Sequence, residues 1–441
     1  MSLAFECSSQ AEVDEIYAHV VGAGFEGEKE PWEAFRGQRY ALLGDPDGRA
    51  RESLRGPLAG RYPARVASER SVTVGGVKIG GGAPVVVQSM TLTKTHDVEA
   101  TTAQIAALAS AGCEVVRVAV PKSEDADALP KIVRFSPLPV IADIHFNASL
   151  ALRAIDAGVA AVRINPGNIG GPDKVALVVQ AAKKAGIPMR IGANSGSLPK
   201  HLADLAQKDQ AEALVEAALE EVRLLEQLDF RDLKISVKSS HVPTMIRAYR
   251  LLASKVPYPL HLGVTEAGTP YAGSIKSAVG MGALLVDGIG DTIRVSLTAD
   301  PVEEVKAGFE ILKALGLRER GPIMIACPSC GRDNVGVQQL AERVEERLRS
   351  YPEAFEVAVL GCAVNGPGVA GDADFGIAGG RDVGFIYAHG RVLKKASSDI
   401  LVDELFHEID QWIAGGMFRP KRLKMAKPAA LAMAEASAIP L

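Results

Sequence analysis

The sequence lacks several features that would assign it to a common class of protein. Its 49 basic and 53 acidic residues give a formal net charge of −4, so no basic excess points to nucleic acid as a partner. No uninterrupted apolar run reaches the roughly 18 residues that a membrane span requires. The first residues, MSLAFECSSQAEVDE, contain neither a basic segment nor an apolar core, so we expect no signal peptide.

Cysteine is also scarce. The 441 residues contain five cysteines, an odd number, and three of them fall close together. A secreted disulfide framework is therefore not expected, and a reducing cytoplasm is the better prediction. Cys113 lies in a helix-to-strand turn and is interpreted as a buried apolar residue, and Cys7 as a free thiol.

What the sequence does contain is a long alternation of apolar runs and helical segments, from about residue 71 to 318. The strand-like runs are VVVQSM, VVRVAV, PVIADI, AVRINPG, PMRIGAN, LKISVKSS, PLHLGVTEAG and TIRVSL. Eight buried strands separated by helices over about 250 residues predict a (β/α)8 barrel, the TIM-barrel fold. A doubly wound open sheet is the alternative, but its GxGxxG fingerprint after the first strand is missing.

Composition divides the chain into four segments. Residues 1–60 predict a short α+β extension, with a hairpin around GDPDG and a linker, and residues 61–320 are expected to form the barrel. Residues 321–415 predict a small α/β domain with helices at QQLAERVEERLRS and DILVDELFHEIDQWI. Residues 416–441, rich in Ala, Lys and Pro, are interpreted as a tail.

Polar residues gather at the predicted ends of the barrel strands, where the active sites of such barrels lie. In chain order they are Gln88, Ser89, Arg117, Asp143, His145, Arg163, Asn165, Arg190, Asn194, Lys234, Ser236, Lys238, His261, Thr265, Glu266, Arg294 and Ser296. Four arginines and two lysines share this set with few acids, and such charges are costly to bury unpaired. Because arginine suits phosphate oxygens, we expect a phosphorylated or diphosphorylated small ligand.

The second domain contains a potential metal centre. Cys327 and Cys330 form a C-x2-C pair in ACPSCGRDN, and Cys362 follows in GCAVNGPGV. Thiolates bind zinc or iron–sulfur clusters. Structural zinc prefers four protein ligands, whereas three cysteines and one other position suit a [4Fe–4S] cluster with one distinct iron. From these residues alone, both the cluster and zinc stay open.

Ordered motifs from about residue 70 to 413 resemble the 4-hydroxy-3-methylbut-2-enyl diphosphate synthase family of the methylerythritol phosphate route to isoprenoids, in its compact bacterial form. They are VQSMT, ADIHF, RINPGNIG, RIGANSGSL, LHLGVTEAG, GIGDTIRVSL, DPVEEVKAGF, ACPSCGR and GCAVNGPG. The resemblance implies reductive ring opening of 2-C-methyl-D-erythritol 2,4-cyclodiphosphate, with loss of water, on a [4Fe–4S] cluster. It also implies flavodoxin or ferredoxin as electron donor. A homodimer is implied too, in which one chain's cluster domain closes over the other chain's barrel.

The same resemblance implies roles for individual residues. The diphosphate would be held by Arg117, Arg163, Lys234 and Arg294, with polar contacts from Asn194, Ser296 and Asn365. Glu266 would transfer a proton near the reacting carbon, and Asp143 and His145 would shape the pocket floor. The cluster ligands would be Cys327, Cys330 and Cys362.

One position departs from the family pattern. In this family NGPG is normally followed by a glutamate that binds the fourth iron, and here residue 369 is valine. Water or hydroxide could take that place, Asp372 or Asp374 could reach it after a loop shift, or the cluster could be labile. The last case favours an alternative, a catalytically impaired cluster or zinc protein that binds phosphorylated ligands.

A third hypothesis is a redox-neutral lyase or aldolase with a zinc-stapled appendage. A Schiff-base lysine must be isolated from other charged groups, and Lys234 and Lys238 stand among too many anion-binding groups to favour it.

Near the N-terminus, residues 10–54 resemble half of a vicinal oxygen chelate module of the glyoxalase and bleomycin-resistance kind. Glu52 falls at the spacing of a metal ligand there. We interpret this segment as a fused remnant without chemistry.

Overall fold

The structure is a computed structural model that describes residues 4–6, 18, 27–34, 38–44, 51–55, 68–165, 169–362, 364, 366–380 and 383–415. The chain forms two compact units, Met1–Arg318 and Glu319–Leu441. Among the described residues, no helix is both long enough and apolar enough to cross a bilayer.

Eight parallel strands form the core of the first unit, and each lies within one of the predicted apolar runs. They are β7 (Val86–Met90), β8 (Val115–Ala119), β9 (Val140–Asp143), β10 (Ala161–Arg163), β11 (Met189–Ile191), β12 (Leu233–Ile235), β13 (His261–Leu262) and β14 (Thr292–Ile293). Their order is β12-β11-β10-β9-β8-β7-β14-β13, and a bridge between Ile235 and Leu260 links the two outer strands. The predicted barrel is thereby confirmed.

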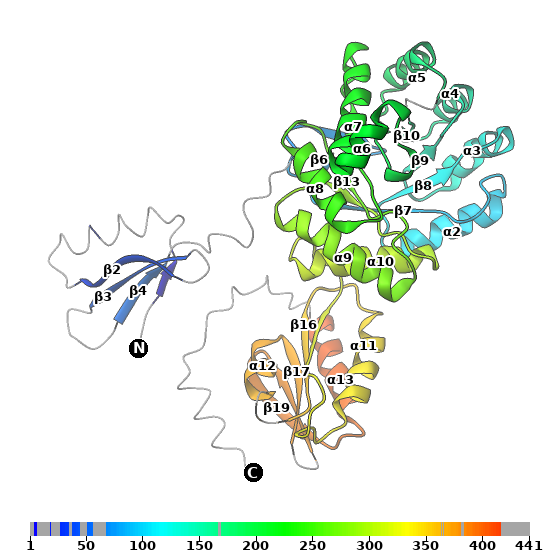
Figure 1. Cartoon of the computed structure of the whole chain (residues 1–441). Coiled ribbons are helices and arrows are strands. Elements are labelled where there is room, and N and C mark those ends of the chain that lie inside the picture. The colour runs from blue at the N-terminus through cyan, green and yellow to red at the C-terminus, as the bar shows by residue number, and fades with distance from the viewer. Residues whose placement is uncertain are drawn as a thin grey trace. The chain divides into compact units, whose positions relative to one another are not determined.

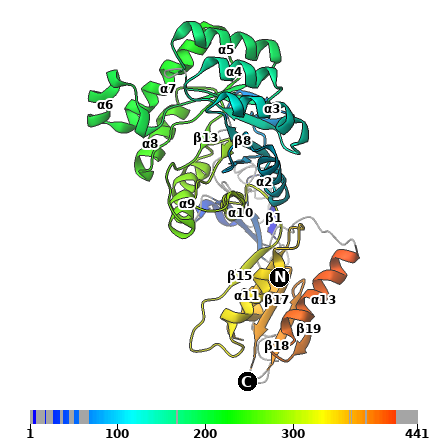
Figure 2. The same cartoon turned by 90° about the vertical axis from the view of Figure 1, so that its right-hand side faces the viewer.

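Helices surround the strands (Figure 1, Figure 2). They are α2 (Val98–Ala111), α3 (Ser123–Phe135), α4 (Ala148–Asp156), α5 (Pro172–Ala185), α6 (Ala203–Lys208), α7 (Gln210–Gln227), α8 (Val242–Ala253), α9 (Pro270–Val286) and α10 (Pro301–Ala314), with short 3-10 turns at Ser195–Ser197 and Lys200–Leu202. Several of these helices start where the sequence provides a cap. For example, the Asp97 and Asp300 side chains accept the N–H groups of Ala100 and Val302.

Strand alternation decides which residues face the barrel interior. In β8, Val116 packs into the core beneath the helices, whereas Val115 packs with the start of other strands. Because side chains alternate along a strand, Arg117 lies on the same face as Val115. The interior is therefore apolar where the strands begin and cationic where they end.

A hairpin, β5 (Ser71–Val74) and β6 (Val77–Gly80), supplies further apolar residues to the start of the barrel. Its Val72, Val74 and Ile79 are buried against Val86 and Val115. This contact fills the amino end of the strands, so ligands have access to the interior at the carboxyl end.

The second unit is a five-stranded sheet of order β15-β16-β17-β18-β19, parallel across the first three strands and antiparallel across the last three. Its elements are β15 (Ile323–Ala326), α11 (Val337–Leu348), β16 (Glu356–Leu360), α12 (Gly366–Asp372), β17 (Phe375–Gly379), β18 (Gly384–Ala388), β19 (Arg391–Ala396) and α13 (Leu401–Ala414). Helices α11 and α13 cover one face and α12 the other (Figure 1). Both predicted helices of this domain are present.

The N-terminal segment contains a four-stranded sheet of order β1-β4-β3-β2, from β1 (Ala4–Glu6), β2 (Gly27–Ala34), β3 (Gln38–Gly44) and β4 (Arg51–Arg55). Strands β3 and β4 pair antiparallel, Gly44 with Arg51, on either side of the predicted GDPDG turn. Apart from residue 18, the predicted helix of this segment falls outside the described residues, as do Cys7, the linker and the tail after Gly415.

Candidate functional site

Three cations stand side by side on neighbouring barrel strands. Arg163 pairs in register with Arg190 across β10 and β11, and Arg190 pairs with Lys234 across β11 and β12. All three are buried, and Lys234 is fully so, at 0% exposure. Arg117 and Lys238 are buried as well, and the Arg294 side chain is 14% exposed. The predicted strand-end cations therefore line the barrel interior.

Asp143 compensates two of these charges. Arg163 donates from Nη1 to Asp143 Oδ1 at 3.0 Å, and Arg117 Nε lies 3.3 Å from Oδ2. Burial alone would raise the pKa of Asp143, but Arg117, His145 and Arg163 outweigh it and hold that pKa well below its ordinary value. Asp143 is thus ionised and fixes both guanidinium groups in place.

Glu304 compensates Arg294. It lies on α10 and is buried; its carboxylate accepts from Ser89 Oγ at 3.1 Å, from the Leu297 N–H at 2.9 Å and from Arg294 Nη2 at 3.4 Å. Sequence reasoning missed this acid. Glu304 lies on the buried face of an amphipathic helix. A glutamate in a helical sequence pattern is normally interpreted as exposed, so its role was not recognised.

Other polar groups of the interior have no hydrogen-bond partner within the described part of the chain. They are Lys234 Nζ, Arg190 Nη1, Arg294 Nε, His261 Nε2 and both amide atoms of Gln88. Burial, then Arg190 and Arg117, lower the pKa of Lys234 to about 7, and similar causes lower the pKa values of Lys238 and His261. The interior therefore has more positive charge than its carboxylates neutralise, which favours an anionic ligand.

A cavity of about 380 Å³ opens at the carboxyl end of the strands. It is lined by Asn194, Ser195, Gly196, Ser197, Ser240, Thr265 and Glu266. Glu266 is exposed and has a φ of 53°, a left-handed conformation that is strained for a residue other than glycine. Such strain is common at functional sites. The cavity thus joins two predicted site residues, Asn194 and Glu266.

The remaining predicted site residues are Ser296, His145 and Asn365. Ser296 is half-buried two residues after Arg294, beyond the carboxyl end of β14. His145 lies beside Arg163, with Nε2 2.6 Å from Nη1. Asn365 falls outside the described residues.

A half-buried glutamate supports the loop that carries Asn194. Glu221, on α7, accepts the N–H of Gly192 at 2.8 Å, and burial raises its pKa to about 8. Gly192 has a φ of 144°, and a Cβ there would overlap the carbonyl oxygen of Ser236. The close approach of β11 to β12 therefore depends on glycine, a requirement that the sequence alone did not show.

The three clustered cysteines follow adjacent parallel strands of the second unit. Cys327 comes directly after β15, and Cys362 comes two residues after β16. The Gly361 N–H donates to Cys327 Sγ at 3.2 Å, which joins the two loops. Cys330 is exposed, and hydrogen bonds from the backbone and side chain of Arg332 lower its pKa. Cys113 instead is buried in the barrel, and burial raises its pKa to about 11.

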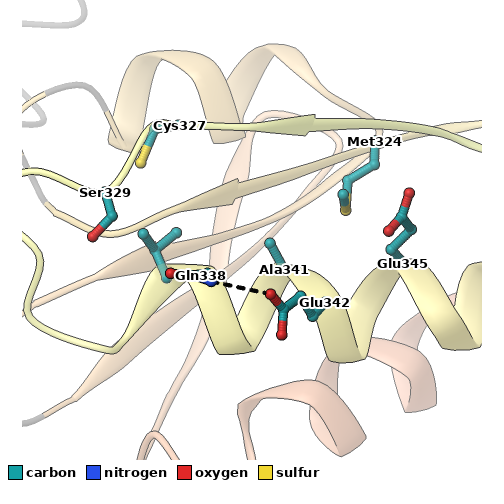
Figure 3. Close-up of a pocket in the computed structure, with 8 residues that line it drawn as sticks. Met324, Cys327, Ser329, Gln338, Ala341, Glu342 and Glu345 are labelled. Carbon is teal, nitrogen blue, oxygen red and sulfur yellow. Dashed lines mark hydrogen bonds between the residues drawn. The ribbon is translucent and has the colours of Figure 1, made fainter. Parts of the chain in front are cut away.

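A groove of about 380 Å³ runs from these loops along α11. Figure 3 shows Cys327 and Ser329 at one end and Met324 and Glu345 at the other. Within the described ranges, no three His, Cys, Asp or Glu side chains are gathered closely enough to hold a single metal ion. The loops nevertheless bring three soft thiol donors to one end of the sheet.

Two family descriptions match the chain: "GcpE TIM-barrel domain" over residues 69–309 and "GcpE protein C-terminal domain" over residues 323–411. Relatives named 4-hydroxy-3-methylbut-2-en-1-yl diphosphate synthase (flavodoxin) match over most of their length. That of Geobacter sulfurreducens is 53% identical over 348 residues, covering 79% of this chain and 99% of the relative. That of Salinispora arenicola is 55% identical over 353 residues, covering 80% and 89%.

Solved structures are more distant. Dihydropteroate synthase from Xanthomonas albilineans, in complex with 7,8-dihydropteroate, aligns with 56% of this chain and 98% of its own. Its sequence identity to this chain is 18% and its TM-score is 0.40.

Proposed function

Because this chain belongs to the GcpE family of 4-hydroxy-3-methylbut-2-en-1-yl diphosphate synthases, we propose that it is the oxidoreductase its relatives are named for. The reaction opens the ring of 2-C-methyl-D-erythritol 2,4-cyclodiphosphate. Two electrons and two protons enter, a ring C–O bond to the diphosphate breaks, one hydroxyl leaves as water, and a carbon–carbon double bond forms. The product is (E)-4-hydroxy-3-methylbut-2-enyl diphosphate.

The observation that supports this function is the unpaired positive charge inside the barrel. Each of three cationic side chains has one buried nitrogen without a hydrogen-bond partner in the described part of the chain. They are Lys234, Arg190 and Arg294. Charge-assisted bonds to a diphosphate would satisfy these donors and supply the missing negative charge. We therefore assign the diphosphate to Arg117, Arg163, Lys234 and Arg294, with polar contacts from Asn194, Ser296 and Asn365.

Glu266 is the proposed proton donor or acceptor. It lines the cavity together with Asn194 and Thr265, at the carboxyl end of the strands that carry the cations. An exposed carboxylate in this position reaches a substrate whose diphosphate lies deeper in the barrel. Asp143 acts at a distance from the reacting atoms, because it orients Arg117 and Arg163.

The donor set in the second unit fits a [4Fe–4S] cluster. A cluster binds each thiolate through a different iron, so three cysteines on two joined loops suit it better than a single-ion site. Cys327, Cys330 and Cys362 would hold the group, and the Gly361 N–H would donate to a ligand sulfur. The cluster would supply one-electron redox chemistry. We propose flavodoxin or ferredoxin as the donor, a homodimer, and a cytoplasmic location because of the few cysteines.

The alternative, an impaired protein that only binds phosphorylated ligands, depends on Val369 alone. The high identity to named enzymes over 79% of the chain does not favour it. Anaerobic reconstitution followed by assay with reduced flavodoxin and the cyclodiphosphate separates the two. We expect about four irons and four sulfides per chain, and formation of the linear diphosphate detected by mass spectrometry. Tight cyclodiphosphate binding without iron uptake or product would instead establish the alternative.

A further inference from the structure

One carboxylate, that of Asp333, lies where the two loops that carry the three cysteines meet. The Asp333 N–H donates to the carbonyl of Cys330 at 2.9 Å. Its Oδ1 faces Gly361 so closely that a Cβ on Gly361 would lie 2.8 Å from it. Gly361 precedes Cys362 and donates its N–H to Cys327 Sγ. Asp333 therefore contacts the Cys330 backbone and lies against Gly361, the residue that precedes Cys362 and is hydrogen-bonded to the Cys327 thiol.

The carboxylate has room for another bond. Oδ2 accepts the Val337 N–H at 2.9 Å, the first of α11, and is 3.4 Å from Ser329 Oγ. Oδ1 accepts only the Val335 N–H, at 3.1 Å, among the hydrogen bonds of the described chain. An ionised carboxylate offers about four lone-pair positions. One position on Oδ1, the oxygen that faces Gly361, is left for a further partner.

The other acids considered as the fourth ligand, Asp374 and Asp372, lie at the end of the sheet opposite the cysteine loops. Asp374 precedes β17 and accepts the N–H of Glu356, the first residue of β16. Cys362 comes two residues after the end of β16, and five strand residues span about 16 Å. Asp374 is therefore a strand's length from the cysteines.

Asp372 is excluded by the direction of α12. A Cβ on Gly366, where the helix begins, would touch Ala378 near the end of β17, whereas Ala370 lies against Gly376 near the start. Asp372, at the last position of the helix, therefore lies toward the start of β17 and away from the cysteine loops. Neither Asp372 nor Asp374 reaches those loops while α12 is folded.

Val369 cannot serve as the fourth ligand either. It is half-buried on α12 and packs against an apolar cluster that includes Ala358, Leu360 and Phe385. An isopropyl group has no atom that can bind iron. The position to which the resemblance assigns a glutamate thus has a packing role in this chain.

We propose that Asp333 is the fourth protein donor of the metal centre held by Cys327, Cys330 and Cys362. This inference rests on the proposed iron–sulfur function. Carboxylate oxygen binds iron, and a donor from the C-x2-C loop itself needs no contribution from α12. The loop that places Asp333 also starts α11, so one side chain anchors the helix and binds the metal.

The test compares D333N, D333A and a matched control, D372N, which removes an exposed acid from the same unit. Asparagine keeps the volume and one oxygen to anchor α11, but it is neutral and a much weaker iron ligand. Each protein is reconstituted anaerobically, its iron and sulfide are counted, and iron loss to a chelator is followed. The [3Fe–4S] fraction after mild oxidation is measured by EPR, and circular dichroism of the apo proteins monitors folding.

We expect D333N and D333A both to lose the fourth iron about tenfold faster than the wild type or more, as loss of a group in a metal site typically does. D372N should match the wild type. If D333N retains iron like the wild type, Asp333 only anchors α11 and the inference is wrong, although the function stands. If the wild type itself takes up no iron and sulfide, the proposed function fails and the inference fails with it.

Discussion

Arg190 and Lys234 are register partners on neighbouring strands, so two buried cations stand side by side inside the barrel. Burial and the nearby Arg190 and Arg117 lower the pKa of Lys234 to about 7. No carboxylate contributes to that shift, because Asp143 and Glu304 are occupied by other arginines. A bound diphosphate would be the first counter-charge beside Lys234, and it would raise the lysine's pKa.

This relationship predicts that diphosphate binding takes up a proton. Below a pH of about 7, Lys234 is already charged in the free protein, so its contribution to the affinity should be constant. Between pH 7 and the higher pKa of the complex, the lysine must acquire its proton on binding, and this contribution should fall up to about tenfold per pH unit. Calorimetry with pyrophosphate at pH 8, in two buffers of different ionisation enthalpy, measures the uptake.

The matched variant is K234M, which keeps the length and apolar stem of the side chain. Its pyrophosphate binding should be weaker at pH 6.5 and should show less proton uptake at pH 8. Proton uptake unchanged from the wild type in K234M would assign the titration to another group, such as Lys238 or His261.

A second prediction concerns Asp143, which neutralises two buried arginines. D143N preserves shape but leaves Arg117 and Arg163 without their counter-charge. Breaking a buried ion pair in this way costs roughly 3–5 kcal/mol of unfolding free energy. Denaturant unfolding of the apo protein measures the loss, and pyrophosphate should restore more stability to D143N than to the wild type.

The control for D143N is D127N. Asp127 is an exposed acid that pairs with Arg153 on the barrel surface. Exposed pairs contribute about 0–1 kcal/mol, so D127N should be nearly neutral. If D143N proves as mild as D127N, other groups hold the arginines and the cation arrangement does not depend on Asp143.

The barrel could be predicted because its strands are buried on both faces and therefore read as continuous apolar runs. The strand ends were less predictable. PLHLGVTEAG reads as one strand, yet β13 contains only His261 and Leu262. After Leu262 the chain leaves the ladder to form the loop in which Glu266 adopts its left-handed conformation. Apolar content does not reveal where hydrogen bonding between strands stops.

The charges of the site could be predicted one by one, but their pairing could not. Arg117 and Arg163 were recognisable at strand ends, whereas Glu304 is 215 residues from Ser89, which it contacts. Its partners are set by the closure of the barrel. Likewise, the cysteine spacing indicated a metal centre without showing that Asp333 lies beside Gly361. Contacts between distant segments decide these features.

A third prediction follows from the close approach of β11 to β12. In G192A the new Cβ would overlap the Ser236 carbonyl, and the φ of 144° is unfavourable for alanine. We expect a loss of roughly 3 kcal/mol or more. Ligand binding should weaken too, because Asn194 follows in the same loop. Denaturant unfolding and pyrophosphate titration measure both effects.

Gly196 provides the internal control for G192A. It lies four residues later, and a Cβ there would have no atom within 4 Å. G196A should therefore change the free energy of unfolding by less than about 0.5 kcal/mol. Equal effects of the two variants would mean that the loop as a whole resists substitution, and that the Ser236 contact is not the cause.

The last prediction concerns Glu266, whose strained backbone places an exposed carboxylate at the cavity. E266Q preserves size and polarity but cannot exchange a proton with the substrate. We expect turnover by the reconstituted enzyme to fall by about 10²–10⁴-fold, the usual contribution of a general acid or base. Substrate affinity should change little, because the diphosphate is held by the cations deeper in the barrel. Single-turnover rates and equilibrium binding, measured on the same preparation, separate the two quantities.

The control for E266Q is E303Q, which alters an exposed glutamate on α10 and should keep full turnover. A parallel loss of affinity and rate in E266Q would make Glu266 a binding residue and leave the proton donor to be found elsewhere.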